Sequence, residues 1–130
     1  MIVDSSVVVA MLKLEPEGEG FALAIANADH PTMSAGNYLE AGSVIDGLGD
    51  PIASANLDRL LQQLGVEIAP VTPAQARIAR QAYRDFGKGS GHPAQLDYGD
   101  CFAYALAIER GEPLLFKGND FAQTGVQRAQ

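Results

Sequence analysis

Four carboxylates in the sequence could form one reactive site, although they lie far apart along the chain. Asp4 follows the apolar residues 1–3, and Glu40 interrupts a stretch of apolar and small residues. Asp100 stands near the start of another apolar stretch, and Asp120 comes shortly after the last one. Each has an ordinary explanation when taken alone, as a residue at a helix start, on a helix surface or in a turn. The alternative is that they act together.

Carboxylates gathered into a small volume require a counter-charge at neutral pH. Like charges raise one another's pKa values and destabilise the folded state. The ions that prefer carboxylate oxygen are hard cations such as Mg²⁺ and Mn²⁺. One or two such ions can polarise a phosphodiester, lower the pKa of a bound water and stabilise the leaving oxygen. The sequence therefore predicts a site for Mg²⁺, with Mn²⁺ as a substitute, whose catalytic and metal-ligating residues are Asp4, Glu40, Asp100 and Asp120.

The charge of the whole chain is unfavourable for binding nucleic acid without such a cation. Sixteen acidic residues outweigh nine basic residues, which gives a net charge of −7. This balance argues against bulk attraction to nucleic acid or to anionic membranes. Contact with nucleic acid would therefore depend on local basic side chains, for which the candidates are Lys13, Arg77, Arg80, Arg84, Lys88 and Lys117. The alternative for the arginines is an ordinary solvated helix face.

Alternating strand and helix patterns must bring the four acids together. Apolar or alternating stretches predict strands at residues 1–4, 66–71 and 112–118 and a short extended piece at 30–37. Helical periodicity and helix-start signals predict helices at residues 5–15, 16–28, from about 35 to 48, 52–65, 73–87 and 98–111. Residues 119–130 form a tail with room for one more short strand.

This order of elements predicts an α/β sandwich, with a short, mainly parallel central sheet between helices on both faces. Ligand sites in such sheets lie beyond the carboxyl ends of the strands. Asp4 sits at the carboxyl end of the first predicted strand, and residues 117–120 come just past the last. No internal repeat or long linker divides the chain, so we expect a single domain at residues 1–130.

Composition excludes several other classes of protein. No apolar run approaches the roughly 18 residues of a membrane span, and no positive charge precedes residues 7–12 as in a secretory signal. The single cysteine, Cys101, cannot form an internal disulfide and favours a reducing, cytoplasmic location. One cysteine and two histidines cannot build a zinc site without carboxylates.

Four stretches of the sequence, in this order, resemble the signature stretches of PIN-domain ribonucleases of the VapC toxin family. They are MIVDSSVVVAML with Asp4, SAGNYLEAGSVI with Glu40, LDYGDCFAYALA with Asp100 and LLFKGNDFAQT with Asp120. The resemblance runs from residue 1 to about residue 124, which is nearly the whole chain. It implies a PIN-like three-layer sandwich and hydrolysis of RNA at a Mg²⁺ or Mn²⁺ site, leaving 3′-hydroxyl and 5′-phosphate ends.

The resemblance also assigns roles around the acids. Ser5 or Ser6 occupies the place of the hydroxyl residue that often follows the first aspartate. Many relatives carry Thr-x-Asp directly after the last strand, whereas this chain has Gly118 there, so the fourth role falls to Asp120 with Asn119 as a helper. Asp97 is a further candidate, and the cap of the following helix is its alternative role.

The same resemblance implies protein partners. VapC toxins are held by a small VapB-like antitoxin whose C-terminal segment wraps the toxin and blocks its site. A homodimer of the toxin within the toxin–antitoxin complex is expected by the same analogy.

Two other functions compete with the ribonuclease. A phosphoacceptor receiver domain would be an acidic α/β protein of this size with a lysine after its last strand, as Lys117 is. It also requires an acidic pair after the first strand and an acceptor aspartate after a middle strand, and the sequence offers Ser5-Ser6 after Asp4 and places Asp50 in a Gly-Asp-Pro turn. A non-catalytic PIN-like scaffold that binds RNA or protein is the second rival, and the presence of all four acids argues against it.

Overall fold

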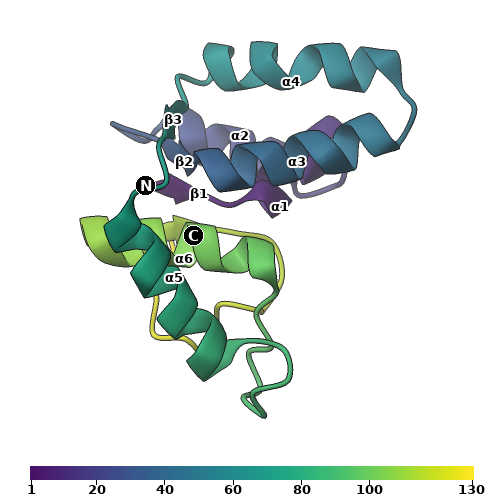
Figure 1. Ribbon diagram of the computed structural model, residues 1–130. Coiled ribbons are helices and arrows are strands. Elements are labelled where there is room, and N and C mark those ends of the chain that lie inside the picture. Colours follow the sequence, from purple (N-terminus) through teal and green to yellow (C-terminus); the bar gives the residue numbers. More distant parts are fainter.

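The computed structural model describes residues 1–130 and contains one parallel sheet of four short strands. In spatial order these are β3 (Glu67–Ala69), β2 (Thr32–Ser34), β1 (Ile2–Val3) and β4 (Leu114–Leu115). Every neighbouring pair is parallel, with Ile2 opposite Thr32 on one side and Leu114 on the other. Parallel strands require crossover connections, and helices supply them here (Figure 1).

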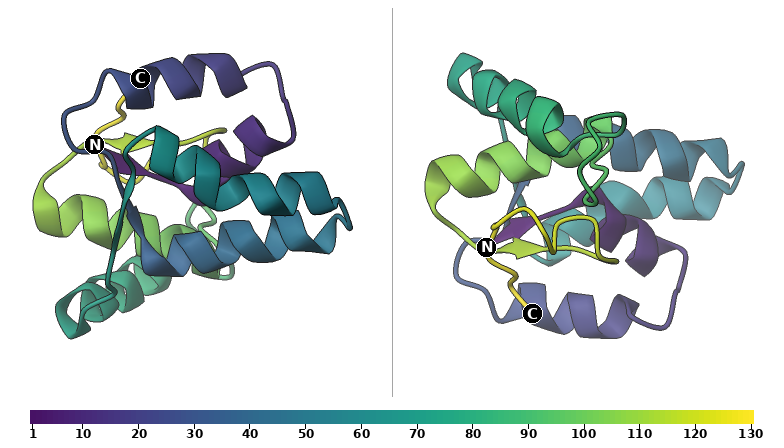
Figure 2. Two further views of the ribbon diagram at one scale, coloured as in Figure 1. Left: turned by 90° about the horizontal axis from the view of Figure 1, so that it is seen from above. Right: turned by 90° about the horizontal axis from the view of Figure 1, so that it is seen from below.

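Six helices surround the sheet. Their bounds are α1 (Ser5–Leu12), α2 (Gly18–Ala26), α3 (Ala35–Gly47), α4 (Pro51–Gln63), α5 (Pro73–Phe86) and α6 (Tyr98–Arg110). Helix α2 covers one face of the sheet, whereas α5 and α6 cover the other (Figure 2). Helices α3 and α4 pack side by side and extend past the sheet. The arrangement confirms the predicted α/β class, with a parallel sheet between helices.

The alternation of side chains along the strands creates two hydrophobic cores. Val3, Met33 and Leu115 point into a core shared with α1, α2 and α4. Ile2 and Leu114, one residue earlier in their strands, point into a second core shared with α5 and α6. Successive strand residues face opposite sides of a sheet, so strands of two or three residues suffice to build both cores.

Polar side chains fix where the helices begin, as the sequence predicts. The Thr72 hydroxyl accepts a hydrogen bond from the Gln75 amide at 3.2 Å, and Pro73 occupies the first turn of α5. Asp50 caps α4 in the same way, through the amides of Ile52 and Ala53. The Thr72 cap confirms the predicted start of α5 at residue 73, whereas α4 begins at Pro51, one residue before its predicted start.

The first helix is three residues shorter than predicted. Leu14 adopts a left-handed conformation, with φ of 55°, and the Glu15 amide donates to the Ala10 carbonyl at 2.9 Å. Together with the bond from Leu14 to Met11, this is a Schellman ending, which normally uses glycine. The leucine gives no sequence signal for this ending, and its side chain is 89% exposed.

The C-terminal tail was predicted to have room for a strand and forms only an isolated bridge. Arg128 pairs with Leu114, and the remaining tail residues run in turns. The last strand is likewise only two residues long, not the predicted stretch at 112–118. Residues 117–120 form a bend after β4 and are not part of the sheet, so their path is not set by strand pairing.

A close approach between α3 and α6 depends on a glycine. A Cβ atom added at Gly36 would lie 2.6 Å from the ring of Phe102 on α6. A Cβ atom at Gly42, on the same helix, would meet Leu57 at an ordinary 3.6 Å. The first glycine therefore sets the spacing of two helices, whereas the second does not.

We expect Gly36→Ala to lower the free energy of unfolding by about 1–3 kcal/mol, because Phe102 must shift out of its place. Gly42→Ala is the matched control and should raise it by about 0.5–1 kcal/mol, because alanine is the better helix former. Urea unfolding followed by circular dichroism measures both. Equal effects of the two substitutions would contradict the close packing of α3 on α6.

Candidate functional site

Asp4 is a buried carboxylate with one oxygen left unpartnered. It directly follows β1 and caps α1, where its Oδ2 accepts a hydrogen bond from the Ser6 amide at 3.0 Å. The residue is only 2% exposed, and Oδ1 has no hydrogen-bond partner. Capping thus satisfies half of the carboxylate and leaves the other half without a partner, which is unusual for a buried polar atom.

Glu40 projects from α3 toward the start of α1. Its Oε1 accepts hydrogen bonds from the Ser5 hydroxyl and from the Asn37 side-chain amide, the latter at 3.3 Å. Asn37 is fully buried and also donates to the Gly99 carbonyl at 2.9 Å, which joins α3 to the first turn of α6. The Oδ1 atom of Asn37 is the other buried side-chain oxygen that lacks a partner.

Asp97 and Asp100 form a reciprocal cap at the start of α6. The Asp97 side chain accepts from the Asp100 amide, and the Asp100 side chain accepts from the Asp97 amide, both at 2.9 Å. This arrangement confirms the sequence interpretation of Asp97 as the helix cap. Asp100 itself is 8% exposed, so its position brings a second buried carboxylate to the site.

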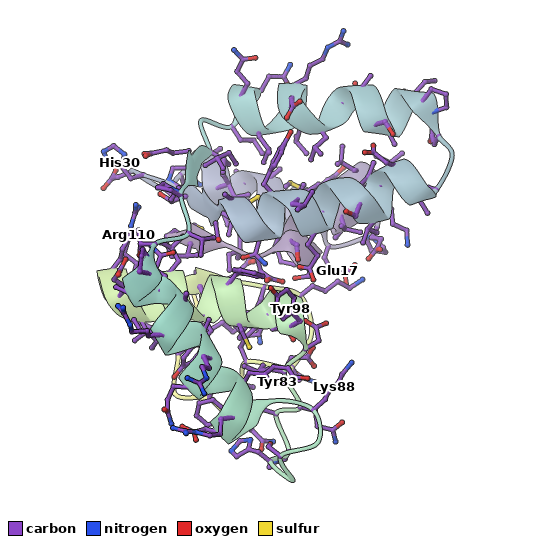
Figure 3. The ribbon with its side chains drawn as sticks, viewed as in Figure 1. Glu17, His30, Tyr83, Lys88, Tyr98 and Arg110 are labelled. Carbon is purple, nitrogen blue, oxygen red and sulfur yellow. The ribbon has the colours of Figure 1, made fainter.

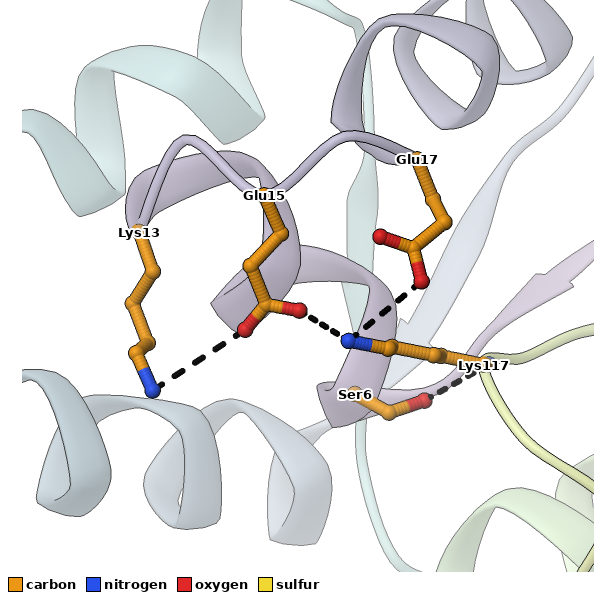
Figure 4. A network of polar contacts seen from close by, with 5 residues as sticks. All are labelled: Ser6, Lys13, Glu15, Glu17 and Lys117. Atoms are coloured by element: carbon orange, nitrogen blue, oxygen red, sulfur yellow. Dashed lines mark hydrogen bonds and ion pairs between the residues drawn. The ribbon is translucent and has the colours of Figure 1, made fainter.

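Asp120 approaches the site from the bend after β4. It is exposed, and it lies near enough to Asp100 to raise the pKa of that carboxyl. The bend is attached to α1 through the Lys117 amide, which donates to the Ser6 hydroxyl at 3.0 Å (Figure 4). The side chain of Asn119 is exposed as well, and its backbone carbonyl accepts from Ala122.

Burial and mutual repulsion raise the pKa values of the two buried aspartates. The pKa of Asp4 rises to about 6, mainly because the carboxyl is buried, with further contributions from Glu40 and Asp97. The pKa of Asp100 rises to about 8 for the same leading reason, with added repulsion from Asp4, Asp97 and Asp120. Five carboxylates drawn from four parts of the chain therefore act on one another across a small volume.

The adjacent cysteine is unsuited to nucleophilic chemistry. Burial, followed by the charges of Asp100 and Asp97, raises the pKa of Cys101 to about 12. A nucleophilic cysteine requires a lowered pKa and partial exposure, whereas this thiol is buried and donates to the Asp97 carbonyl. The carboxylates are therefore the candidate reactive groups of the site.

The donors fit a hard cation that keeps much of its own water. No three His, Cys, Asp or Glu side chains of the chain are placed to hold one metal ion together. Mg²⁺ is commonly bound through one or two carboxylates and several waters, which requires less of the protein than a closed zinc site does. The unpartnered oxygens of Asp4 and Asn37 are acceptors suited to such an ion or its waters. Mg²⁺ therefore fits this donor set.

The predicted basic residues divide into four groups. Lys117 forms ion pairs with Glu15 and with Glu17, the latter at 3.4 Å, and Lys13 reaches Glu15 at 3.9 Å (Figure 4). These glutamates neutralise both lysines and raise the pKa of Lys117. Arg77 lines a groove with Tyr104 and Ile108, whereas Arg80 and Arg84 line a different groove beside Tyr98, and Lys88 is exposed in the loop after α5.

Two site residues were missed by the sequence reasoning. Asn37 lies three positions before Glu40 on one helix face, and this spacing is the signal that could have found it. Gly99 gives room for the Glu40 carboxylate, which a Cβ atom at that position would overlap. A glycine next to an aspartate gives no such signal in a single sequence.

The chain belongs to the PIN domain family, whose sequence model matches residues 1–127. Its relatives include ribonuclease VapC28 of Mycobacterium tuberculosis, 56% identical over 99% of this chain and 97% of the relative. Ribonuclease VapC42 of the same organism is 44% identical over 99% of this chain and 98% of the relative. The resemblance to VapC toxins inferred from the four stretches is thereby confirmed.

Solved structures with little sequence similarity share the fold. The sarcin-ricin loop cleaving toxin VapC20 of Mycobacterium tuberculosis superposes with a TM-score of 0.73 at 15% identity, over 96% of this chain and 95% of that one. A toxin–antitoxin complex from Klebsiella pneumoniae contains a chain with a TM-score of 0.71 at 14% identity, over 95% and 92% of the two chains. At these identities the likeness concerns the fold.

We expect the stability of the metal-free protein to fall as pH rises from 6 to 8. The folded chain holds a proton on Asp100 up to a pKa of about 8, whereas the unfolded chain releases it near the ordinary value of 3.8. For each proton that only the folded state holds, the free energy of unfolding falls by up to about 1.4 kcal/mol with each unit rise in pH. Urea unfolding in EDTA at several pH values measures the slope.

Asp100→Asn should flatten this slope between pH 6 and 8, because the titrating group is gone. Asp46→Asn, which removes an exposed carboxylate of α3, is the control and should leave the slope unchanged. A slope that survives in Asp100→Asn would assign the titration to another group.

Gly99→Ala should weaken metal binding while the protein stays folded. The new Cβ atom would occupy the place of the Glu40 carboxylate, which can move because it ends a flexible side chain. Loss of such supporting contacts typically costs about 10- to 100-fold in metal affinity, and titration calorimetry with Mn²⁺ measures it. Gly42→Ala is the control on α3, and equal affinities of the two variants would refute a role for Glu40 in metal binding.

Proposed function

We propose that this protein is a Mg²⁺-dependent endoribonuclease toxin that a cognate antitoxin neutralises. The observation that carries the proposal is the buried Asp4 carboxylate with a free Oδ1, placed among Glu40, Asp97 and Asp100 in a chain of the VapC family. The ribonuclease names of its close relatives support RNA as the substrate. Mg²⁺ fits the donors described above, and Mn²⁺ is its expected substitute.

The bound Mg²⁺ would supply charge neutralisation for the scissile phosphate and lower the pKa of a bound water. Asp4 and Asp100 would hold the ion, since both are buried and each resists ionisation until a counter-charge arrives. Glu40, fixed by Ser5 and Asn37, is placed to accept a proton from the attacking water. Asp120, being exposed on a bend, would complete the site, with Asn119 as a helper.

The scaffold of hydrogen bonds around the acids orients them before substrate arrives. Ser6 holds the bend after β4 in place through the Lys117 amide, and Asp97 fixes the start of α6. Reactive groups that are already oriented avoid reorganisation during the reaction, which is a major source of rate enhancement. Ser5, Ser6 and Asp97 would thus act by positioning the acids.

An antitoxin and a second copy of the chain are the proposed protein partners. The toxin–antitoxin complex from Klebsiella pneumoniae among the structural neighbours supports the first of these. No helix of the chain is both long and apolar enough to span a membrane. We propose the cytoplasm as the place of action, because the chain has a single, buried free cysteine.

Asp4→Asn should reduce cleavage of a mixed cellular RNA pool by at least about 100-fold, because it removes the buried charge that holds the ion. Wild-type protein with Mg²⁺ should give discrete fragments that disappear in EDTA. Asp46→Asn is the control and should cleave like the wild type. Mg²⁺ should also raise the melting temperature of the wild type and not that of Asp4→Asn.

Two results would overturn the proposal. Fragments that persist in EDTA would show a metal-independent nuclease. Intact RNA with both Mg²⁺ and Mn²⁺, from protein whose fold is verified, would favour the non-catalytic scaffold.

A further inference from the structure

A groove lies between α5 and α6, the helix whose first turn also carries Asp100. It has a volume of about 410 Å³ and is lined by Ala76, Ala79, Arg80, Tyr83, Arg84, Tyr98, Cys101 and Phe102. Figure 3 shows Tyr83 near the end of α5 and Tyr98 at the start of α6, next to the loop that joins the two helices. The volume is in the range of pockets that hold small organic groups.

Two aromatic rings of α6, those of Tyr98 and Phe102, line the groove, and the ring of Tyr98 is exposed to solvent. Tyr98 is 75% exposed and meets Phe102 edge to face, with ring centroids 5.2 Å apart and an angle of 89°. The ring of Phe102 packs closely against Gly36 of α3, which fixes its position. Exposed aromatic rings on a fixed support are the surfaces on which unpaired nucleobases stack.

The wall formed by α5 carries cations that no carboxylate neutralises. Neither Arg80 nor Arg84 takes part in any of the ion pairs of the chain, and Arg84 donates only to the neutral Gln81. Lys13 and Lys117 are, by contrast, paired with glutamates. In a protein of net charge −7, two free guanidinium groups beside a stacking surface complement a phosphate.

The groove and the carboxylate site share the first turn of α6. Tyr98 lies between Asp97 and Asp100, and Cys101 and Phe102 follow Asp100 directly. A nucleotide stacked on Tyr98 would therefore lie within one helical turn of the acids. An apolar peptide would use the small and aromatic residues and leave both arginines without a partner.

We propose that this groove binds one nucleoside of single-stranded RNA next to the scissile phosphate, with the base stacked on Tyr98 and the neighbouring phosphate on Arg80 and Arg84. The inference rests on the proposed ribonuclease function and adds to it the place where a base is held. Arg77, on the other groove of the same helix, has no part in this binding.

The test is binding of single-stranded tetraribonucleotides in EDTA, which excludes cleavage, measured by NMR titration at low salt. Tyr98→Leu should weaken binding about 10-fold, and Tyr98→Phe, which keeps the ring, should bind like the wild type. Arg84→Gln should weaken binding several-fold and reduce its salt dependence by about one phosphate contact. Arg59→Gln, which removes an exposed cation of α4, is the control and should change nothing.

Cleavage kinetics with Mg²⁺ separate this inference from the function on which it rests. An unchanged KM and unchanged tetranucleotide binding in Tyr98→Leu, with RNA still cut, would overturn the groove and leave the ribonuclease standing. Tyr98-dependent binding without cleavage by any variant would support the groove and refute the ribonuclease. A wild-type dimer that Tyr98→Leu converts to monomer without loss of RNA binding would make the groove a protein interface and overturn the proposal.

Discussion

The burial of like charges at the carboxyl end of a parallel sheet is the constraint on which this structure depends. Asp4 and Asp100 are almost fully buried, and their mutual repulsion adds to the cost of taking each from water. A carboxylate so placed is stabilised by a proton, a hydrogen bond or a cation. Hydrogen bonds from two helix starts provide part of this stabilisation, and one oxygen of Asp4 receives none.

The surrounding fold keeps these charges in place because they also cap the helices that carry them. Asp4 caps α1, and Asp100 completes the cap of α6. Moving either carboxylate away would break a hydrogen bond that stabilises the start of a helix. Ser5 and Asn37 hold Glu40, and Ser6 holds the bend that carries Asp120. The apolar cores on the two faces of the sheet stabilise the fold and offset the cost of burying these like charges.

Positive charge is distributed so that it does not fill the acidic site. Lys13 and Lys117 form ion pairs with Glu15 and Glu17 (Figure 4). Arg80 and Arg84, which form no ion pair, line the groove between α5 and α6. His30 and Arg110 lie toward the opposite end of the molecule from Tyr98 (Figure 3). The acids thus remain available to a small cation, and the arginines to a larger anion.

The sequence by itself determined the order of elements, the caps Thr72 and Asp97, the α/β class and the four acidic stretches, because caps and hydrophobic periodicity are local signals. The left-handed end of α1 at Leu14 has no such signal, because this ending normally uses glycine and the sequence has leucine there. Only the tertiary structure decided that Gly99 of α6 meets Glu40 of α3, and that Arg80 and Arg84 line a different groove from Arg77. These arrangements depend on how helices that are far apart in the sequence pack against one another. The sequence pattern carries no information on the distance between such helices.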